Sequence, residues 1–165
     1  AMLPKLDAVW EDYLEGLDRA LDRLVPVVCI GAIDLLERLS NSPDLLLGLL
    51  TGNVERGAES KLARVDLWSY FKMGAFGDRA AERRLLPQIA VRRAEKLIGH
   101  RFEGKSIVVI GDTPNDILCG RHLGVKAVAV ATGSFTREAL AEYEPDYLFQ
   151  DFGDIESVME AILSY

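Results

Sequence analysis

The sequence has few cysteines, no long hydrophobic run and no excess of positive charge. Two cysteines among 165 residues are too few for a disulfide framework, so we expect a reducing, cytoplasmic environment. The longest apolar runs, Leu45–Leu50 and Val125–Ala131, are shorter than the ~20 residues that cross a bilayer. The net charge of −7 argues against nucleic acid or an anionic membrane as a partner.

What is present fits a globular α/β protein. Hydrophobic residues make up 49% and charged residues 27%, and the length suits one core domain with a small appendage. Periodic apolar residues predict helices, and short apolar runs bounded by turn residues predict buried strands. Leu67–Phe76 is aromatic-rich and is interpreted as a connector. The predicted helices are 7–24, the stretch after Gly31, 54–65, 83–99, 116–123, 136–143 and 155–163, and the predicted strands are 45–50, 107–110, 125–131 and 145–149.

Alternating strands and helices predict a Rossmann-like parallel sheet with helices on both faces. The chemistry of such sheets lies at the carboxyl ends of the strands. Here those ends are Thr51-Gly52-Asn53, Asp112–Asp116 and Thr132-Gly133, all small, polar or acidic. The last of them is interpreted as the start of a loop, and the other two are candidate functional sites.

Asp112 and Asp116 flank the start of a predicted helix. Thr113 suits the N-cap, Pro114 the first helical position, and Asp116 then falls at the third position, where it can complete a capping box. Capping explains Asp116 but leaves Asp112 unexplained. Two carboxylates at one strand end repel each other unless a cation lies between them, and Mg²⁺ suits such a pair.

Two further groups fit a phosphate ligand. Thr51 supplies a hydroxyl at a strand end, Gly52 allows close approach, and Asn53 opens a helix whose free N–H groups attract anions. The alternative is an ordinary turn with Asn53 as the N-cap. Arg83 and Arg84 precede a helix, where their charge opposes the helix dipole, so a phosphate partner explains at least one of them better than local structure does.

Together these segments resemble the haloacid dehalogenase-like hydrolase superfamily, most closely its phosphoglycolate phosphatase-like and β-phosphoglucomutase-like branch. The resemblance rests on Leu47–Asn53, on the arginines before Leu85–Ala90, and on Val108–Asp116. It runs from the N-terminal helix to the end of the sequence. It implies a magnesium-dependent phosphomonoester hydrolase that acts on a small phosphorylated metabolite through an aspartyl-phosphate.

The resemblance also implies roles for individual residues. Thr51 would bind the transferred phosphoryl group, with Gly52 and Asn53 shaping its pocket. Arg83 or Arg84, with a preference for Arg83, would neutralise phosphate and nucleophile. Asp112 and Asp116 would hold Mg²⁺. Residues 1–25 would be the remnant of a helical cap, and residues 26–165 the core domain.

The sequence departs from the family at its first motif. An Asp-x-Asp sequence, which would supply the nucleophile and the general acid, occurs nowhere in the 165 residues. The strand that ends in it, expected between Leu45–Leu50 and Ile107–Ile110, is therefore absent as well. Its loss would leave two sheet edges unpaired and favour self-association.

Three explanations of this departure are open. The sequence is a portion of a longer enzyme, and then inactive alone, which is the explanation we favour. A second chain or a swapped strand could also supply the missing element. As an alternative function, the protein is a nucleophile-free phosphate-binding or regulatory module. A receiver-like fold would explain the acids at the strand ends but not Thr51-Gly52-Asn53.

Overall fold

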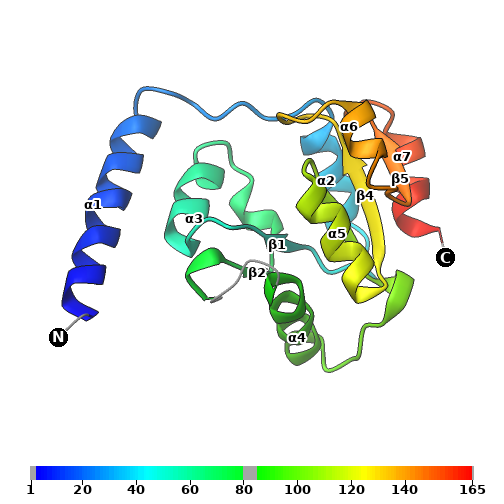
Figure 1. The fold of residues 1–165 in the computed structure, drawn as a ribbon, viewed down its shortest axis with the longest axis horizontal. Helices are drawn as coiled ribbons and strands as arrows, with labels where there is room; N and C mark the ends of the chain where they lie inside the picture. The colour runs from blue at the N-terminus through cyan, green and yellow to red at the C-terminus, as the bar shows by residue number, and fades with distance from the viewer. Residues whose placement is uncertain (1–2, 80–84, 165) are drawn as a thin grey trace.

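The computed structural model describes residues 3–79 and 85–164 (Figure 1). Helices and short parallel strands alternate along most of the chain, as the sequence predicts. The helices are α1 (Leu3–Leu21), α2 (Ala32–Ser40), α3 (Glu55–Ala63), α4 (Leu86–Ile98), α5 (Pro114–Leu123), α6 (Arg137–Ala141) and α7 (Ile155–Leu163). The strands are β1 (Gly48–Leu50), β2 (Met73–Ala75), β3 (Val108–Gly111), β4 (Lys126–Val130) and β5 (Tyr147–Phe149). Short 3-10 turns are η1 (Trp68–Tyr70), η2 (Gly77–Arg79) and η4 (Gly104–Ser106).

The strands form two parallel sheets. In one, β1 pairs with β2, with Leu49 opposite Gly74. In the other the order is β3-β4-β5, with Ile110 opposite Val128 and Ala129 opposite Leu148. In the described part of the chain, β1 and β3 thus belong to different sheets, and each pairs with a strand on one side only. This agrees with the expected gap between them.

Helices cover both faces of the three-stranded sheet. On one face, α2 and α7 form a core cluster of Leu35, Leu39, Val158 and Ile162, against which Val108 and Ile110 of β3 pack. On the other face, α5 and α6 contribute Ile117 and Leu140, which pack on Ala127 and Ala129 of β4. All of β4 is buried, as expected for a central strand, whereas β3 is only half-buried along its length. The α/β fold class with two helical layers is confirmed.

Several predicted elements are confirmed, and two need correction. Helix α7 has the predicted bounds, and Gly99 and Gly124 end α4 and α5 in the left-handed conformation expected of helix C-caps. The strand predicted from Leu45 begins only at Gly48, where its pairing with Met73 of β2 begins. The predicted connector contains strand β2, which is three residues long and is stabilised by its pairing with β1.

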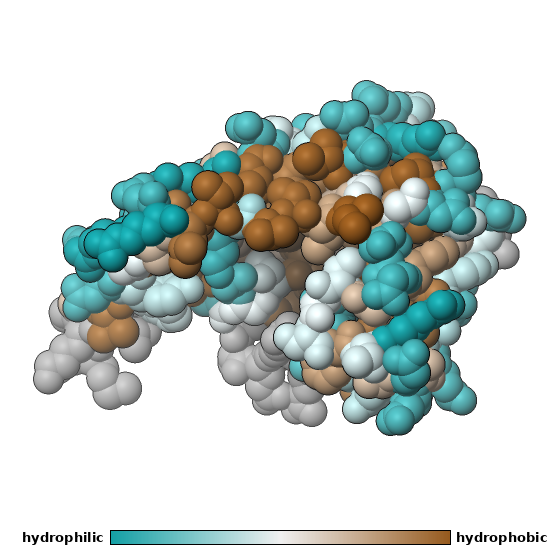
Figure 2. Space-filling view, turned by 90° about the horizontal axis from the view of Figure 1, so that it is seen from above, coloured by the Kyte–Doolittle hydropathy of each residue, from teal (hydrophilic) through white to brown (hydrophobic). Residues whose placement is uncertain are grey.

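The segment between α1 and α2 exposes apolar side chains. Helix α1 lies at one end of the molecule beside α3, and the chain then crosses to α2 as an extended linker (Figure 1). Figure 2 shows a hydrophobic band on the face of the molecule that carries this linker. The exposed apolar residues of this segment are Leu24, Val25, Val27 and Ile30, and Ile33 at the start of α2 is exposed as well. Among the described residues, no helix is both long enough and apolar enough to span a bilayer.

Asp146 connects the start of β4 to the turn before β3. Its Oδ2 accepts a hydrogen bond from Ala127 N at 2.8 Å, and its Oδ1 accepts one from the Lys105 ammonium. Partial burial raises the pKa of the Asp146 carboxyl, but the bonds from Lys105 and Ala127 outweigh it, so the pKa lies below its ordinary value of 3.8.

We expect Asp146→Asn to destabilise the protein in a pH-dependent way. A carboxyl with a lowered folded-state pKa stabilises the fold above its ordinary pKa and loses that effect as the pH falls through the lowered value. The stability difference from wild type should be below about 1 kcal/mol because the pair is partly exposed. This difference in the free energy of unfolding should reach its full size above about pH 5 and disappear as the pH falls through the lowered pKa of Asp146. Urea unfolding at several pH values measures it, with Asp44→Asn as the control, and a pH-independent difference would contradict the assignment.

Candidate active site

The Asp112–Asp116 turn follows β3 directly and begins α5. Thr113 is the N-cap in an extended conformation, with Pro114 in the first turn. Asp116 Oδ2 accepts hydrogen bonds from Thr113 N at 3.1 Å and from Thr113 Oγ1 at 2.7 Å. The predicted capping role of Asp116 is therefore confirmed. Because these bonds converge on a single oxygen, the second oxygen of the carboxylate does not take part in them.

Asp112 lies against the loop that follows the neighbouring strand. A Cβ atom built on Gly133 would lie 1.9 Å from Asp112 Oδ2, so the carboxylate occupies the space that a side chain at position 133 would need. The ends of β3 and β4 thus meet at Asp112 and Gly133, as the carboxyl ends of adjacent parallel strands should. From its sequence, Gly133 was interpreted only as the start of a loop. The signal that could have found it is its place just after a predicted strand.

The Thr51 loop follows β1 and has its own hydrogen-bond network. Thr51 Oγ1 accepts from Asn53 N and from Asn53 Nδ2, both at 3.1 Å. Asn53 Oδ1 in turn accepts from Lys61 Nζ at 3.2 Å. Lys61 was not singled out in the sequence, because it is eight residues from Asn53 and reaches it only once α3 has formed.

The N-cap of α3 differs from the interpretation that placed Asn53 there. The cap residue is Val54, and no side chain caps the helix. Asn53 instead bonds back to Thr51, and its carbonyl accepts from Gly77 N at 2.8 Å. At the start of the helix, Glu55 N donates to Asp78 Oδ1 at 3.3 Å. The helix start therefore presents fewer open N–H groups to an anion than the sequence suggested.

The structure places the predicted residues in two loops. Asp112 and Asp116 share the loop after β3, and Thr51, Gly52 and Asn53 share the loop after β1. Both loops follow carboxyl ends of parallel strands, although the strands belong to separate sheets. Arg83 and Arg84 lie outside the described residues. The roles of all these residues stay predictions.

The donors in the Asp112 loop suit Mg²⁺. Among residues 3–79 and 85–164 there is no group of three or more His, Cys, Asp or Glu side chains that could hold a metal, so a closed zinc-type cage is not found there. Mg²⁺ commonly uses only one or two protein carboxylates and completes its shell with water and substrate phosphate. Asp112 and the second oxygen of Asp116 are carboxylate donors of this kind within one loop, and they would hold such an ion.

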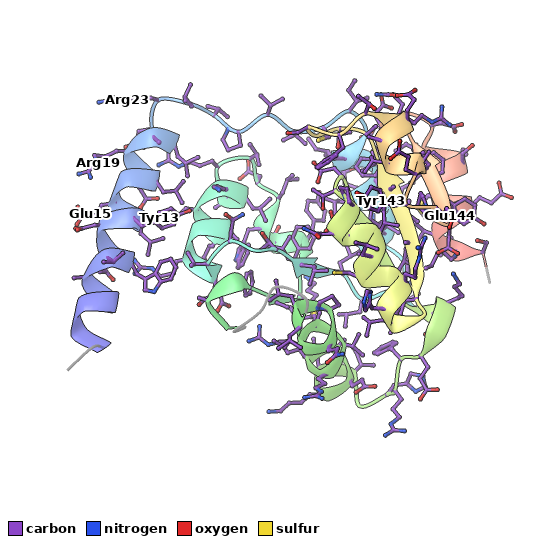
Figure 3. The ribbon with its side chains drawn as sticks, in the orientation of Figure 1. Tyr13, Glu15, Arg19, Arg23, Tyr143 and Glu144 are labelled. Atoms are coloured by element: carbon purple, nitrogen blue, oxygen red, sulfur yellow. The ribbon has the colours of Figure 1, made fainter. Side chains whose placement is uncertain are left out.

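A cavity borders the Thr51 loop. It has a volume of about 450 Å³ and lies between α1 and α3, lined among others by Trp10, Leu14, Val54 and Asp78. In Figure 3, Tyr13 points from α1 toward α3, whereas Glu15 and Arg19 point away from the rest of the molecule. Gly57 of α3 lies close to Tyr13 and Leu17, so the helices can approach closely there. Helix α1 therefore forms a wall of a cavity next to the loop.

Comparison with known proteins gives consistent results. The HAD-hydrolase-like family matches residues 83–155, which include the Asp112 loop. A phosphoglycolate phosphatase from Synechococcus elongatus is 30% identical over 145 residues. These cover 86% of this chain and 65% of that protein, so the chain spans less than two thirds of the length of this relative.

Solved structures have the same fold. A hydrolase from Pseudomonas syringae superposes with a TM-score of 0.71 at 20% identity, covering 96% of this chain and 73% of that one. A haloacid dehalogenase-like family hydrolase from Streptococcus pneumoniae gives a TM-score of 0.60 at 22% identity, covering 77% and 57%. The family match and the sequence relatives support a place in the haloacid dehalogenase-like hydrolase superfamily, in its phosphoglycolate phosphatase-like branch, and the solved structures show that the chain shares the fold.

Proposed function

We propose that this chain provides the phosphate-binding and magnesium-binding parts of a phosphomonoester hydrolase that acts on a small phosphorylated metabolite. The observation that carries the proposal is the pair of polar loops, Thr51–Asn53 and Asp112–Asp116, at the carboxyl ends of parallel strands. The name of the Synechococcus relative, a phosphoglycolate phosphatase, supports a small phosphate ester as the substrate class.

In this proposal the residues of the chain bind and orient the phosphoryl group. The Thr51 hydroxyl donates to a phosphoryl oxygen, and Gly52 leaves room for the ligand at the backbone. Arg83, or Arg84 in its place, neutralises negative charge on the phosphate with a planar pair of N–H donors. Asp112 and Asp116 would hold Mg²⁺, which when bound offsets the charge of the phosphate oxygens. Positioning and charge neutralisation of this kind account for most of the catalysis of phosphoryl transfer.

The covalent step needs a carboxylate nucleophile. An aspartate oxygen attacks phosphorus, the ester P–O bond breaks, and the alcohol leaves with a proton from a general acid. Water then attacks phosphorus and the aspartyl P–O bond breaks, which releases inorganic phosphate and restores the carboxylate. Since the 165 residues contain no Asp-x-Asp sequence, we propose that the nucleophile and the acid lie outside them, in a longer protein or a second chain.

We expect these residues alone to release no nitrophenol from p-nitrophenyl phosphate above the uncatalysed rate. A protein extended upstream through its reading frame should hydrolyse the ester, and removal of Mg²⁺ with a chelator should abolish the activity. The two proteins are compared at equal concentration with and without Mg²⁺. Equal activity in both would contradict the proposed source of the nucleophile. No activity in the longer protein would favour the phosphate-binding module over the hydrolase.

A further inference from the structure

A chain of hydrogen bonds runs from α3 to the end of β1. Lys61 Nζ donates to Asn53 Oδ1 at 3.2 Å, and Asn53 Nδ2 donates to Thr51 Oγ1 at 3.1 Å. All three residues are half-buried. The backbone N–H of Asn53 also donates to Thr51 Oγ1, at 3.1 Å. The ammonium group of Lys61 is thus linked to the Thr51 hydroxyl through a single side-chain amide.

The lysine determines which way the amide faces. A carboxamide has a donor end and an acceptor end of nearly the same shape, and only its hydrogen-bond partners distinguish them. The ammonium of Lys61 can only donate, so the atom that faces it must be the carbonyl oxygen of Asn53. The NH₂ group of Asn53 must then face Thr51. The reverse orientation would place the NH₂ group against the ammonium, with two donors in contact.

This orientation controls the Thr51 hydroxyl. The oxygen accepts from both the backbone N–H and the Nδ2–H of Asn53, which uses its two lone pairs. Its own hydrogen is then free to donate, and within the described part of the chain no acceptor receives it. With the amide reversed, Thr51 O–H would donate to Asn53 Oδ1 instead and would be lost to a ligand.

We propose that Lys61 is a positioning residue that keeps the Thr51 hydroxyl available as a hydrogen-bond donor to a phosphate oxygen. The proposal rests on the function proposed above. Lys61 acts through Asn53 and does not itself contact the phosphate. Its charge also supplies local positive potential, which a protein with a net charge of −7 needs near an anion site.

The test uses the 165-residue chain, labelled with ¹⁵N and ¹³C, and needs no catalytic activity. NMR measures the cross-relaxation between the Asn53 NH₂ protons and the Thr51 side-chain protons. In a separate titration with inorganic phosphate and Mg²⁺, the amide shifts of the Thr51 loop report the affinity. The variants are Lys61→Met, which removes the donor, and Lys61→Arg, which keeps one. Lys96→Met, on the exposed side of α4, is the control for the loss of one positive charge.

We expect the NH₂-to-Thr51 contact in the wild type, in Lys61→Arg and in Lys96→Met, and its loss in Lys61→Met. Phosphate affinity should fall about tenfold in Lys61→Met, the worth of one hydrogen bond to a charged ligand, and change less than about twofold in the other two. The proposal is overturned if the wild type lacks the contact, a result that needs no variant to fold. It is also overturned if Lys61→Met keeps both the contact and the affinity. A wild type that has the contact but binds no phosphate overturns the proposed function while supporting the orientation of Asn53.

Discussion

Replacing Asp112 with asparagine should remove Mg²⁺ binding. The neutral side chain keeps the shape of aspartate but leaves Asp116 as the remaining carboxylate, and one of its oxygens already accepts two bonds from Thr113. A single contact between unit charges at ~4 Å is worth about 4 kcal/mol at an effective dielectric constant of ~20. The loss for a divalent ion should therefore exceed about 100-fold in affinity.

Two measurements on the same samples check this expectation. Calorimetric titration with Mg²⁺ gives the affinity directly, and the rise in Tm on adding Mg²⁺ gives it by linkage. Asp44→Asn, at an exposed position in the turn before β1, carries the same change of charge and should bind Mg²⁺ like the wild type. The magnesium assignment fails if the wild type takes up no Mg²⁺, or if Asp112→Asn takes it up as tightly as the control.

The second large effect is expected at Lys126, which begins β4. Lys126 is only 3% exposed, and within the described part of the chain it is the one charged residue that is buried. The three N–H groups of its ammonium are shared among four oxygens: Ala161 O at 2.8 Å, Ile162 O at 3.0 Å, and the carbonyl and hydroxyl of Ser164. These carbonyls belong to the last turn of α7 or follow it, where the helix dipole favours a cation. Through these hydrogen bonds, Lys126 connects the end of α7 to the start of the central strand β4.

We expect Lys126→Met to lower the free energy of unfolding by about 2–4 kcal/mol, because methionine has a similar length but leaves buried carbonyl groups without their donor. Urea unfolding measures the loss. Lys105→Met is the matched control, because Lys105 is half-exposed and its ion pair with Asp146 should contribute below about 1 kcal/mol. Equal losses in the two variants would show that the buried contacts of Lys126 contribute no more than a surface ion pair.

The elements that were predicted correctly are those whose sequence pattern lies within a short stretch of neighbouring residues. Helix α7 has apolar residues at helical spacing, and the turn from Asp112 to Asp116 contains the cap, the proline and the third-position acid in one short stretch. Strand β2 was missed for the opposite reason. It is too short to show periodicity, and Met73–Ala75 is a strand because β1 lies beside it.

The same distinction holds at the candidate site. The carboxylates and the Thr51 hydroxyl are recognisable in the sequence because each stands where an apolar strand ends. Gly133 and Lys61 are not, because each reaches its partner only once the surrounding structure has formed. Gly133 approaches Asp112 after β4 has paired with β3, and Lys61, eight residues after Asn53, approaches it after α3 has formed.

The sequence by itself therefore determined the alternation of strands and helices, the superfamily resemblance and the chemical character of the two loops, since local spacing and turn chemistry encode these. Only the tertiary structure decided which side chains meet. It shows that Asn53 bonds to Thr51 and Lys61 instead of capping α3, and that the strands form two separate sheets. The Asn53 bonds join residues only two and eight positions apart, and they depend on the shape of the loop and on α3 having formed. The separation into two sheets depends on how elements far apart in the chain pack, and no local pattern records that packing.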